Sequence, residues 1–238
     1  NKILINFIFF LLSLTSIRAQ VVINEIMAYN ATGIMNPDLG ERTDWIEIHN
    51  TGTTPYDLTF CSLSDNRENL DKWIFPAGTI INSAGFLIIW ADEANDLLNG
   101  LHTNFKLNVA GVTVYLVDKN GLLMDSLTFS RQFMNVSYGK TDTTYLAYFS
   151  LPTPGAANDM SSSYRLAAGI SYNPPPGIYQ EYPLVELSWV DSMAVIRYTI
   201  DGSEPDENSE LYKGPLSIKN SIVIRTKIWA DGYQPGWI

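Results

Sequence analysis

Cysteine is almost absent from this sequence, since Cys61 is the only one among 238 residues. No intramolecular disulfide can therefore form. The neighbouring Phe60 and Leu63 are apolar, which favours a buried structural thiol over a reactive one. An exported β protein without disulfides is more typical of bacteria than of animals.

Basic side chains are also few, with 15 Lys and Arg against 25 Asp and Glu, a net charge of −10 and a pI near 4.6. No basic field is available to capture phosphates, which excludes nucleic acid or an anionic membrane surface as the main partner. Aromatic residues make up 12 % and charged residues 17 % of the chain, values that favour folded, aromatic-rich β structure over disorder. The acidic balance fits an extracellular surface.

Histidine occurs only at positions 49 and 102. With one cysteine and no H-E-x-x-H or C-x-x-C motif, the chain has no zinc framework. A G-x-S-x-G nucleophile elbow is absent as well. The stretch "YGKTD" is similar to the end of a phosphate-binding loop, but Met134 stands where the first glycine is required. We therefore predict no catalytic residues and no enzyme activity for the residues given.

Only one long apolar run is present, over residues 3–14. It follows Lys2 and precedes short polar residues and Ala19, a pattern that predicts a secretory signal peptide over residues 1–19. A buried helix or a membrane anchor is the alternative interpretation, although the run is short for a span. The prediction is a secreted or cell-surface bacterial protein without a membrane span in the mature chain.

After residue 20, short runs rich in Val, Ile, Tyr, Phe and Trp alternate with Gly, Asn, Asp and Pro. This spacing predicts an all-β fold made of antiparallel sandwiches. Hairpin turns are expected at residues 50–52, 118–121 and 201–202. The only helix-like stretch is "ADEANDLLNG" at 91–100. The predicted strands include "VVINEIM", "DWIEIHN", "KWIFPAG", "GFLIIWAD", "VTVYLVD" and "LLMDSLTF".

A Pro-, Gly- and Ser-rich region between residues 150 and 180 lacks a strand pattern and predicts a module boundary. We place a first β-sandwich at 20–158, a linker at 159–169 and a second, smaller β module at 170–238. The chain begins with Asn and stops on an apolar tripeptide, so we expect it to be part of a longer protein.

The first module resembles the lamin-tail domain, an immunoglobulin-like β-sandwich that also occurs in exported bacterial proteins. The resemblance rests on an ordered series of motifs: "VVINEIMAYN", "DWIEIHNTG", "YDLTFCSLSDN", "WIFPAGTIINSAGFLIIWADE", "HTNFKLN" and "PTPGAAN".

The second module resembles the immunoglobulin-like module at the C-terminal end of chitobiases and related hexosaminidases. The motifs are "IRYTIDGSEPDENSELYKGPLSI" and "IRTKIWADGY". In that family the module accompanies a catalytic domain, so the resemblance implies an accessory role without catalytic residues.

One stretch, "TDWIEIHNTG", carries Asp, Glu and His within six positions. Strand alternation places Ile46 and Ile48 in the core and Trp45, Glu47 and His49 on the opposite face. Asp44 then lies on the core side, which excludes a catalytic triad. The prediction is a solvated strand face on which Trp45, Glu47 and His49 are candidates for binding.

Acidic loops are candidates for calcium binding, because carboxylate and amide oxygens are the preferred ligands of calcium. Asn24, Glu25 and Asp65 are the candidate metal ligands, although no EF-hand spacing is present. Calcium is thus a possible cofactor, and no other cofactor is predicted.

Three functions fit these observations. The first is a pair of secreted or cell-surface non-catalytic modules for adhesion, display or substrate association, with an extracellular protein or polysaccharide as partner and the chain a monomer. The second is the accessory N-terminal part of a larger exported enzyme, with a spore-coat kinase-like or hydrolase domain beyond residue 238. The third is a carbohydrate-binding module, for which Trp45 is the best candidate platform.

Overall fold

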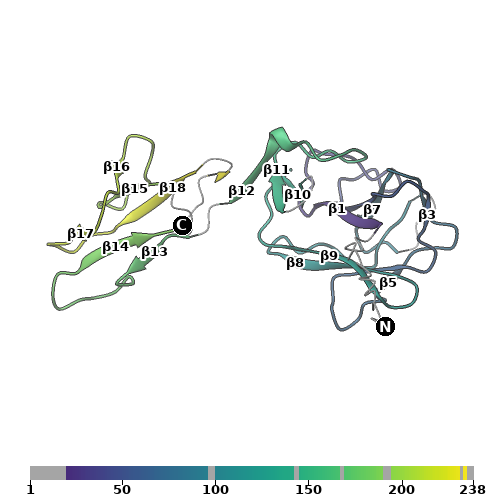
Figure 1. Cartoon of the computed structure of the whole chain (residues 1–238), viewed down its shortest axis with the longest axis horizontal. Coiled ribbons are helices and arrows are strands. Elements are labelled where there is room, and N and C mark those ends of the chain that lie inside the picture. The colour runs from purple at the N-terminus through teal and green to yellow at the C-terminus, as the bar shows by residue number, and fades with distance from the viewer. Residues whose placement is uncertain are drawn as a thin grey trace, which may run out of the picture.

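The computed structural model describes residues 20–95, 100–141, 145–166, 169–189, 194–230 and 233–234. The predicted signal peptide lies outside these residues. Within them the chain forms strands and one short 3-10 turn, η1 (Met160–Ser162), so the predicted all-β class is confirmed. Figure 1 shows two immunoglobulin-like β-sandwich modules, with strand β12 between them.

Two main sheets face each other in the first module. One sheet has the order β12-β11-β10-β1-β2-β7, and the other has the order β5-β4-β8-β9. A two-stranded β3-β6 ribbon accompanies them. The strands are β1 (Val21–Met27), β2 (Asp44–Asn50), β3 (Tyr56–Asp57), β4 (Ser62–Ser64), β5 (Trp73–Ile74), β6 (Ile80–Ile81), β7 (Phe86–Ala91), β8 (Val112–Val117), β9 (Leu123–Phe129), β10 (Ser137–Lys140), β11 (Leu146–Phe149) and β12 (Ser163–Leu166).

The core of the first module lies between these sheets, because alternate residues of each strand point inward. In β2, Ile46 and Ile48 are fully buried in this core, as the alternation predicted. Val114 and Leu116 of β8 belong to the same core and are equally buried. Cys61 is a free, buried thiol in the same core, which confirms its predicted packing role.

The smaller module contains two three-stranded sheets, β13-β14-β17 and β16-β15-β18. A smaller core, with Ile170, Val185, Leu187 and Ile228 at its centre, fills the space between them. The strands are β13 (Ser171–Asn173), β14 (Leu184–Ser188), β15 (Val195–Thr199), β16 (Glu210–Leu211), β17 (Leu216–Ser217), β18 (Arg225–Trp229) and β19 (Tyr233–Gln234).

Two local expectations are corrected. Within the predicted linker 159–169, residues 160–166 instead form η1 and β12, and β12 pairs with β11 on one side and with β19 on the other; residues 167–168 lie outside the described part. The sequence of this segment lacks the apolar pattern of a strand, and β12 is stabilised instead by backbone hydrogen bonds to these two neighbours. The helix-like stretch 91–100 starts no helix over residues 91–95, where Glu93 and Asn95 have φ values of 65° and 54°; residues 96–99 lie outside the described part.

Candidate functional site

Strand β2 positions the three predicted binding residues, but it does not expose them. Trp45 is 1 % exposed and Glu47 is 0 % exposed, so the predicted solvated face is wrong for both. His49 is half-buried and stacks on Phe86, with ring centroids 4.2 Å apart. Burial also lowers the pKa of His49, because it disfavours the charged imidazolium.

Trp45 is covered by a second, small apolar cluster on the outer side of the sheet. Met27 and Trp90 are buried against it, and Ile34 and Ile88 pack at the edge. Met27 and Trp90 are its register partners on the two neighbouring strands. Trp45 therefore serves as a core residue of this cluster.

A β-bulge at Asn24 brings the next candidates together. Ile23 pairs with Ile48 and Glu25 with Glu47, so Asn24 is one extra residue in β1. The bulge allows Ile23 and Ile26 both to enter the core, while Glu25 lies beside Glu47 on the outer side. The Asn24 amide donates a hydrogen bond to Glu47 Oε1 at 2.7 Å.

The loop 152–158 covers these two glutamates. Its Thr153 N–H lies 3.3 Å from Glu25 Oε2, and its Gly155 N–H donates to Glu47 Oε2 at 2.5 Å. Asn158 completes the contact, because its side chain donates to the carbonyl oxygens of Asn24 and Lys140. The "PTPGAAN" motif therefore acts as a lid over a buried polar cluster, a role that sequence reasoning missed although it had noted the motif.

The predicted calcium ligands do not form one set. Asn24 and Glu25 belong to the first sheet, whereas Asp65 follows β4 in the second sheet and forms an ion pair with Lys72 at 2.7 Å. Among the described residues there is no group of three or more His, Cys, Asp or Glu side chains that could hold a metal. The oxygens of Glu25 and Glu47 already accept protein hydrogen bonds. Calcium remains an untested prediction, and the geometry offers it no prepared cage.

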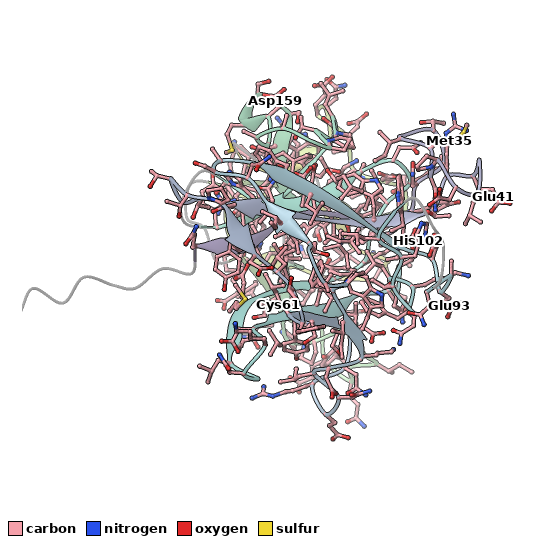
Figure 2. The ribbon with its side chains drawn as sticks, turned by 90° about the vertical axis from the view of Figure 1, so that its right-hand side faces the viewer. Met35, Glu41, Cys61, Glu93, His102 and Asp159 are labelled. Atoms are coloured by element: carbon pink, nitrogen blue, oxygen red, sulfur yellow. The ribbon has the colours of Figure 1, made fainter. Side chains whose placement is uncertain are left out.

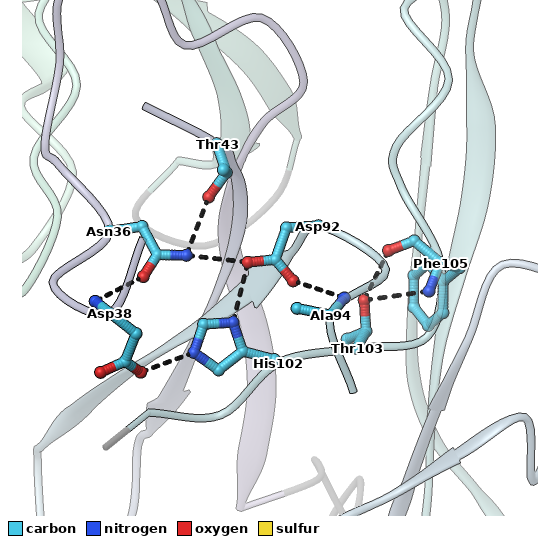
Figure 3. A network of polar contacts seen from close by, with 8 residues as sticks. All are labelled: Asn36, Asp38, Thr43, Asp92, Ala94, His102, Thr103 and Phe105. Carbon is cyan, nitrogen blue, oxygen red and sulfur yellow. Dashed lines mark hydrogen bonds and ion pairs between the residues drawn. The ribbon is translucent and has the colours of Figure 1, made fainter. Parts of the chain in front are cut away.

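His102, the other histidine, is the centre of a second buried network. Its Nδ1 lies 2.8 Å from Asp92 Oδ2 and its Nε2 lies 2.9 Å from Asp38 Oδ2 (Figure 3). Asn36 donates to the same Asp92 oxygen at 2.8 Å. Figure 2 places His102 on the side of the module where Met35, Glu41 and Glu93 lie.

The network around His102 joins the loop before β2 to the segment after β7. Both ring nitrogens of His102 face carboxylates, and its side chain is 1 % exposed. The two hydrogen bonds of the ring therefore go to Asp92 and Asp38. Its role is to fix the end of the sandwich.

A cavity with a volume of about 610 Å³ lies in the second module. This size is within the range of ligand-binding pockets. Its floor reaches the core residues Val185, Ile218 and Ile224. One wall is the segment 174–183, in which three consecutive prolines restrict the backbone.

Aromatic and polar side chains border this groove. Tyr182 is 74 % exposed and Tyr179 is 43 % exposed. Two acidic and two basic side chains line the groove, so their charges balance; Lys227 and Glu204 form an ion pair at 2.9 Å. The charged lining residues are Glu181, Glu204, Arg225 and Lys227. The sequence did not point to this groove, because the expected sugar-binding side chain was a tryptophan. The exposed rings are instead tyrosines in "NPPPGIYQEYP".

Comparison with known families identifies both modules. Residues 15–131 match the family described as Lamin Tail Domain, and residues 174–237 match the Chitobiase/beta-hexosaminidase C-terminal domain. The first match ends before β10 and β11, which nevertheless belong to the same sheet as β1 and β2. No curated protein matches the chain. Both matched domains are non-catalytic. Separately, no helix in the described part is long and apolar enough to span a bilayer.

Proposed function

Because the chain consists of a lamin tail domain followed by a chitobiase/β-hexosaminidase C-terminal domain, we propose that it is an exported, non-catalytic pair of modules that associates with an extracellular polysaccharide. The groove of the second module supports this proposal. The first module serves as a rigid support, since its predicted binding face is buried.

The chemistry of the groove favours a neutral polysaccharide chain. Sugar rings have an apolar face that packs on exposed aromatic rings such as Tyr179 and Tyr182. Hydroxyl groups at the ring edge match the polar side chains at the rim. The balanced charge of the rim gives a uronate or sulfated chain no net attraction, because two carboxylates accompany the two cations.

The experiment measures retention of the full chain on insoluble chitin, cellulose and xylan, and on polygalacturonate as the acidic comparison. We expect retention on at least one neutral polymer and a loss of about fivefold or more in affinity for Tyr182→Ala, since one stacked ring contributes on the order of 1 kcal/mol or more. Tyr29→Ala is the matched control, because Tyr29 is 46 % exposed but lies in the first module.

Two results would contradict the proposal. The first is the absence of retention on every polymer by a chain whose near-ultraviolet circular dichroism shows a folded state. The second is equal retention of the Tyr182→Ala, Tyr29→Ala and unchanged proteins.

A second candidate function is that of an accessory region in a larger exported enzyme, either a hydrolase or a protein with a spore-coat kinase-like domain. The name of the second matched domain favours the hydrolase, because it refers to the C-terminal domain of chitobiases and β-hexosaminidases. Sequencing the gene beyond the codon for residue 238 tests it. A stop codon directly after that position would dismiss this candidate.

A further inference from the structure

An ion pair lines the groove of the second module. Lys227 of β18 donates a hydrogen bond to Glu204 Oε1 at 2.9 Å, and both residues belong to the groove wall. The side chain of Lys227 is 25 % exposed and that of Glu204 is 40 % exposed. A partly exposed ion pair of this kind contributes little to the stability of a fold. Its charged atoms are accessible to a ligand in the groove.

The loop that carries Glu204 is fixed before any ligand binds. The N–H of Gly202 donates to the carbonyl oxygen of Val223 at 3.1 Å, and Arg225 Nη1 donates to the carbonyl oxygen of Gly202 at 3.4 Å. Pro205 follows Glu204, is buried and restricts the backbone there. Because the loop is already ordered, holding the Glu204 carboxylate against a ligand costs little further entropy.

The ammonium group of Lys227 is held in a similar way. Its Nζ lies 5.8 Å from the ring centroid of Trp229, which projects from the same face of β18. The backbone of Lys227 is paired with Arg197 of β15. The groove therefore presents an ordered carboxylate and an ordered ammonium group side by side.

These two groups differ in what they can bind. A carboxylate only accepts hydrogen bonds and an ammonium group only donates them, whereas a hydroxyl does both. Two hydroxyls on neighbouring carbons of a sugar ring lie close together, so one can donate to Glu204 while the other accepts from Lys227. Hydrogen bonds to charged partners are stronger than those between neutral groups. A pair of adjacent hydroxyls therefore matches the ion pair.

An acetamido group matches it less well. Its amide is planar and trans, so the N–H and the C=O point in opposite directions. The charged atoms of Glu204 and Lys227 are only 2.9 Å apart, so one acetamido group can reach one of them and not both. In chitin this group replaces one of the two adjacent hydroxyls, whereas cellulose and xylan keep both. The ion pair can therefore distinguish polymers whose rings stack on tyrosine in the same way.

We propose that Glu204 and Lys227 determine the specificity of the groove, and that its ligand is a neutral 1,4-linked glycan with two adjacent free hydroxyls on each sugar. This inference rests on the proposed function, because it requires that the groove binds a polysaccharide. Tyr179 and Tyr182 supply the stacking surface that such chains share, and the ion pair selects among them. A uronate would place a second negative charge beside Glu204, which is unfavourable.

Isothermal titration of the full chain with cellohexaose, xylohexaose and chitohexaose tests the proposal. We expect the first two to bind about tenfold or more tightly than chitohexaose, since chitohexaose loses one hydrogen bond to a charged partner. In Lys227→Met the side chain keeps its length but loses its donors, so this ratio of affinities should fall towards one. Glu204→Gln removes the charge of the acceptor and should reduce the ratio as well.

Lys213→Met is the matched control, because Lys213 is an exposed lysine of the same module and is not one of the residues that line the groove. It should leave the ratio of affinities unchanged. A purely structural role of the ion pair would change the stability of the variants and leave this ratio as it is.

Two kinds of result would overturn the inference. Equal affinity of the unchanged protein for all three hexasaccharides, or a preference for chitohexaose, does so without the need for any variant. An unchanged ratio in a folded Lys227→Met also does so. In both cases the proposed function stands, because the groove still binds glycans. If a folded chain binds none of the hexasaccharides and none of the polymers, the proposed function fails and this inference fails with it.

Discussion

His102 Nδ1 lies 2.8 Å from Asp92 Oδ2, and this contact, with that to Asp38, links two loops at one end of the first sandwich. His102→Ala would leave two buried carboxylates facing a cavity. We expect the free energy of unfolding to fall by about 3 kcal/mol, as measured by urea denaturation at pH 6. His49→Ala is the control and should cost about 1 kcal/mol or less, because His49 is half-buried and stacks on one ring. Equal losses for the two variants would show that the network around His102 does not stabilise the fold.

Trp45 offers a test of its structural role. Trp45→Ala should destabilise the first module by about 3–5 kcal/mol, because it empties a buried site between Met27 and Trp90. Trp45→Phe should cost much less, since the indole N–H is buried and has no acceptor in the described structure. Thermal unfolding measures both. Retention of Trp45→Phe on polysaccharide should match that of the unchanged protein; a selective loss of binding would restore the sequence-based prediction for this residue.

Gly139 pairs with Glu25 directly beside the bulge in β1. A Cβ atom there would lie 2.4 Å from the carbonyl oxygen of Asn24 and 2.9 Å from Glu25 Cα. Because both contacts are with backbone, we expect Gly139→Ala to cost about 2 kcal/mol or more and to loosen the loop 152–158. Gly169→Ala is the control, since a Cβ at Gly169 meets nothing within 4 Å. Stability measured by denaturation should separate the two; similar stabilities would mean that the bulge relaxes without cost.

The protonation of Asp44 should make the free energy of unfolding depend on pH. Burial raises its pKa from 3.8 to about 7, against the opposing effects of the Leu107 N–H and of Lys106. The folded state therefore binds a proton that the unfolded state loses, and stability falls as pH rises from about 4 to about 7. Asp44→Asn should remove this contribution, so its advantage over the unchanged protein should grow by up to about 1.4 kcal/mol per pH unit in that window. Denaturation curves at pH 4.5, 6 and 7.5 measure it, and a constant difference would show that Asp44 titrates normally.

Much of the fold was accessible from the sequence because it depends on local regularities. Alternation in "DWIEIHN" correctly assigned Ile46 and Ile48 to the core. The turn at 118–121 was also predicted correctly, since Asp118 accepts from the N–H groups of Asn120 and Leu122 between β8 and β9. Ordered motifs identified both modules.

The site was less accessible because burial of the outer face depends on distant segments. Strand alternation correctly assigned Trp45 and Glu47 to the face opposite the core. It does not reveal which other segments of the chain cover that face. Residues more than 100 positions away in the sequence cover Glu47, through the N–H of Gly155. Similarly, Asp38, Asp92 and His102 meet only when separate loops converge.

The sequence by itself determined the all-β class, the two modules and the lack of a catalytic motif, because strand period, turn residues and motif spacing are properties of neighbouring positions. Only the tertiary structure decided that the Trp45 face is interior, that Glu25 lies opposite Glu47 and that tyrosines line the groove. The bulge at Asn24 is one physical reason why the positions of these side chains depend on the tertiary structure. One extra residue reverses which side chains face the core, and hydrogen bonds from a remote loop stabilise the polar groups that this reversal buries.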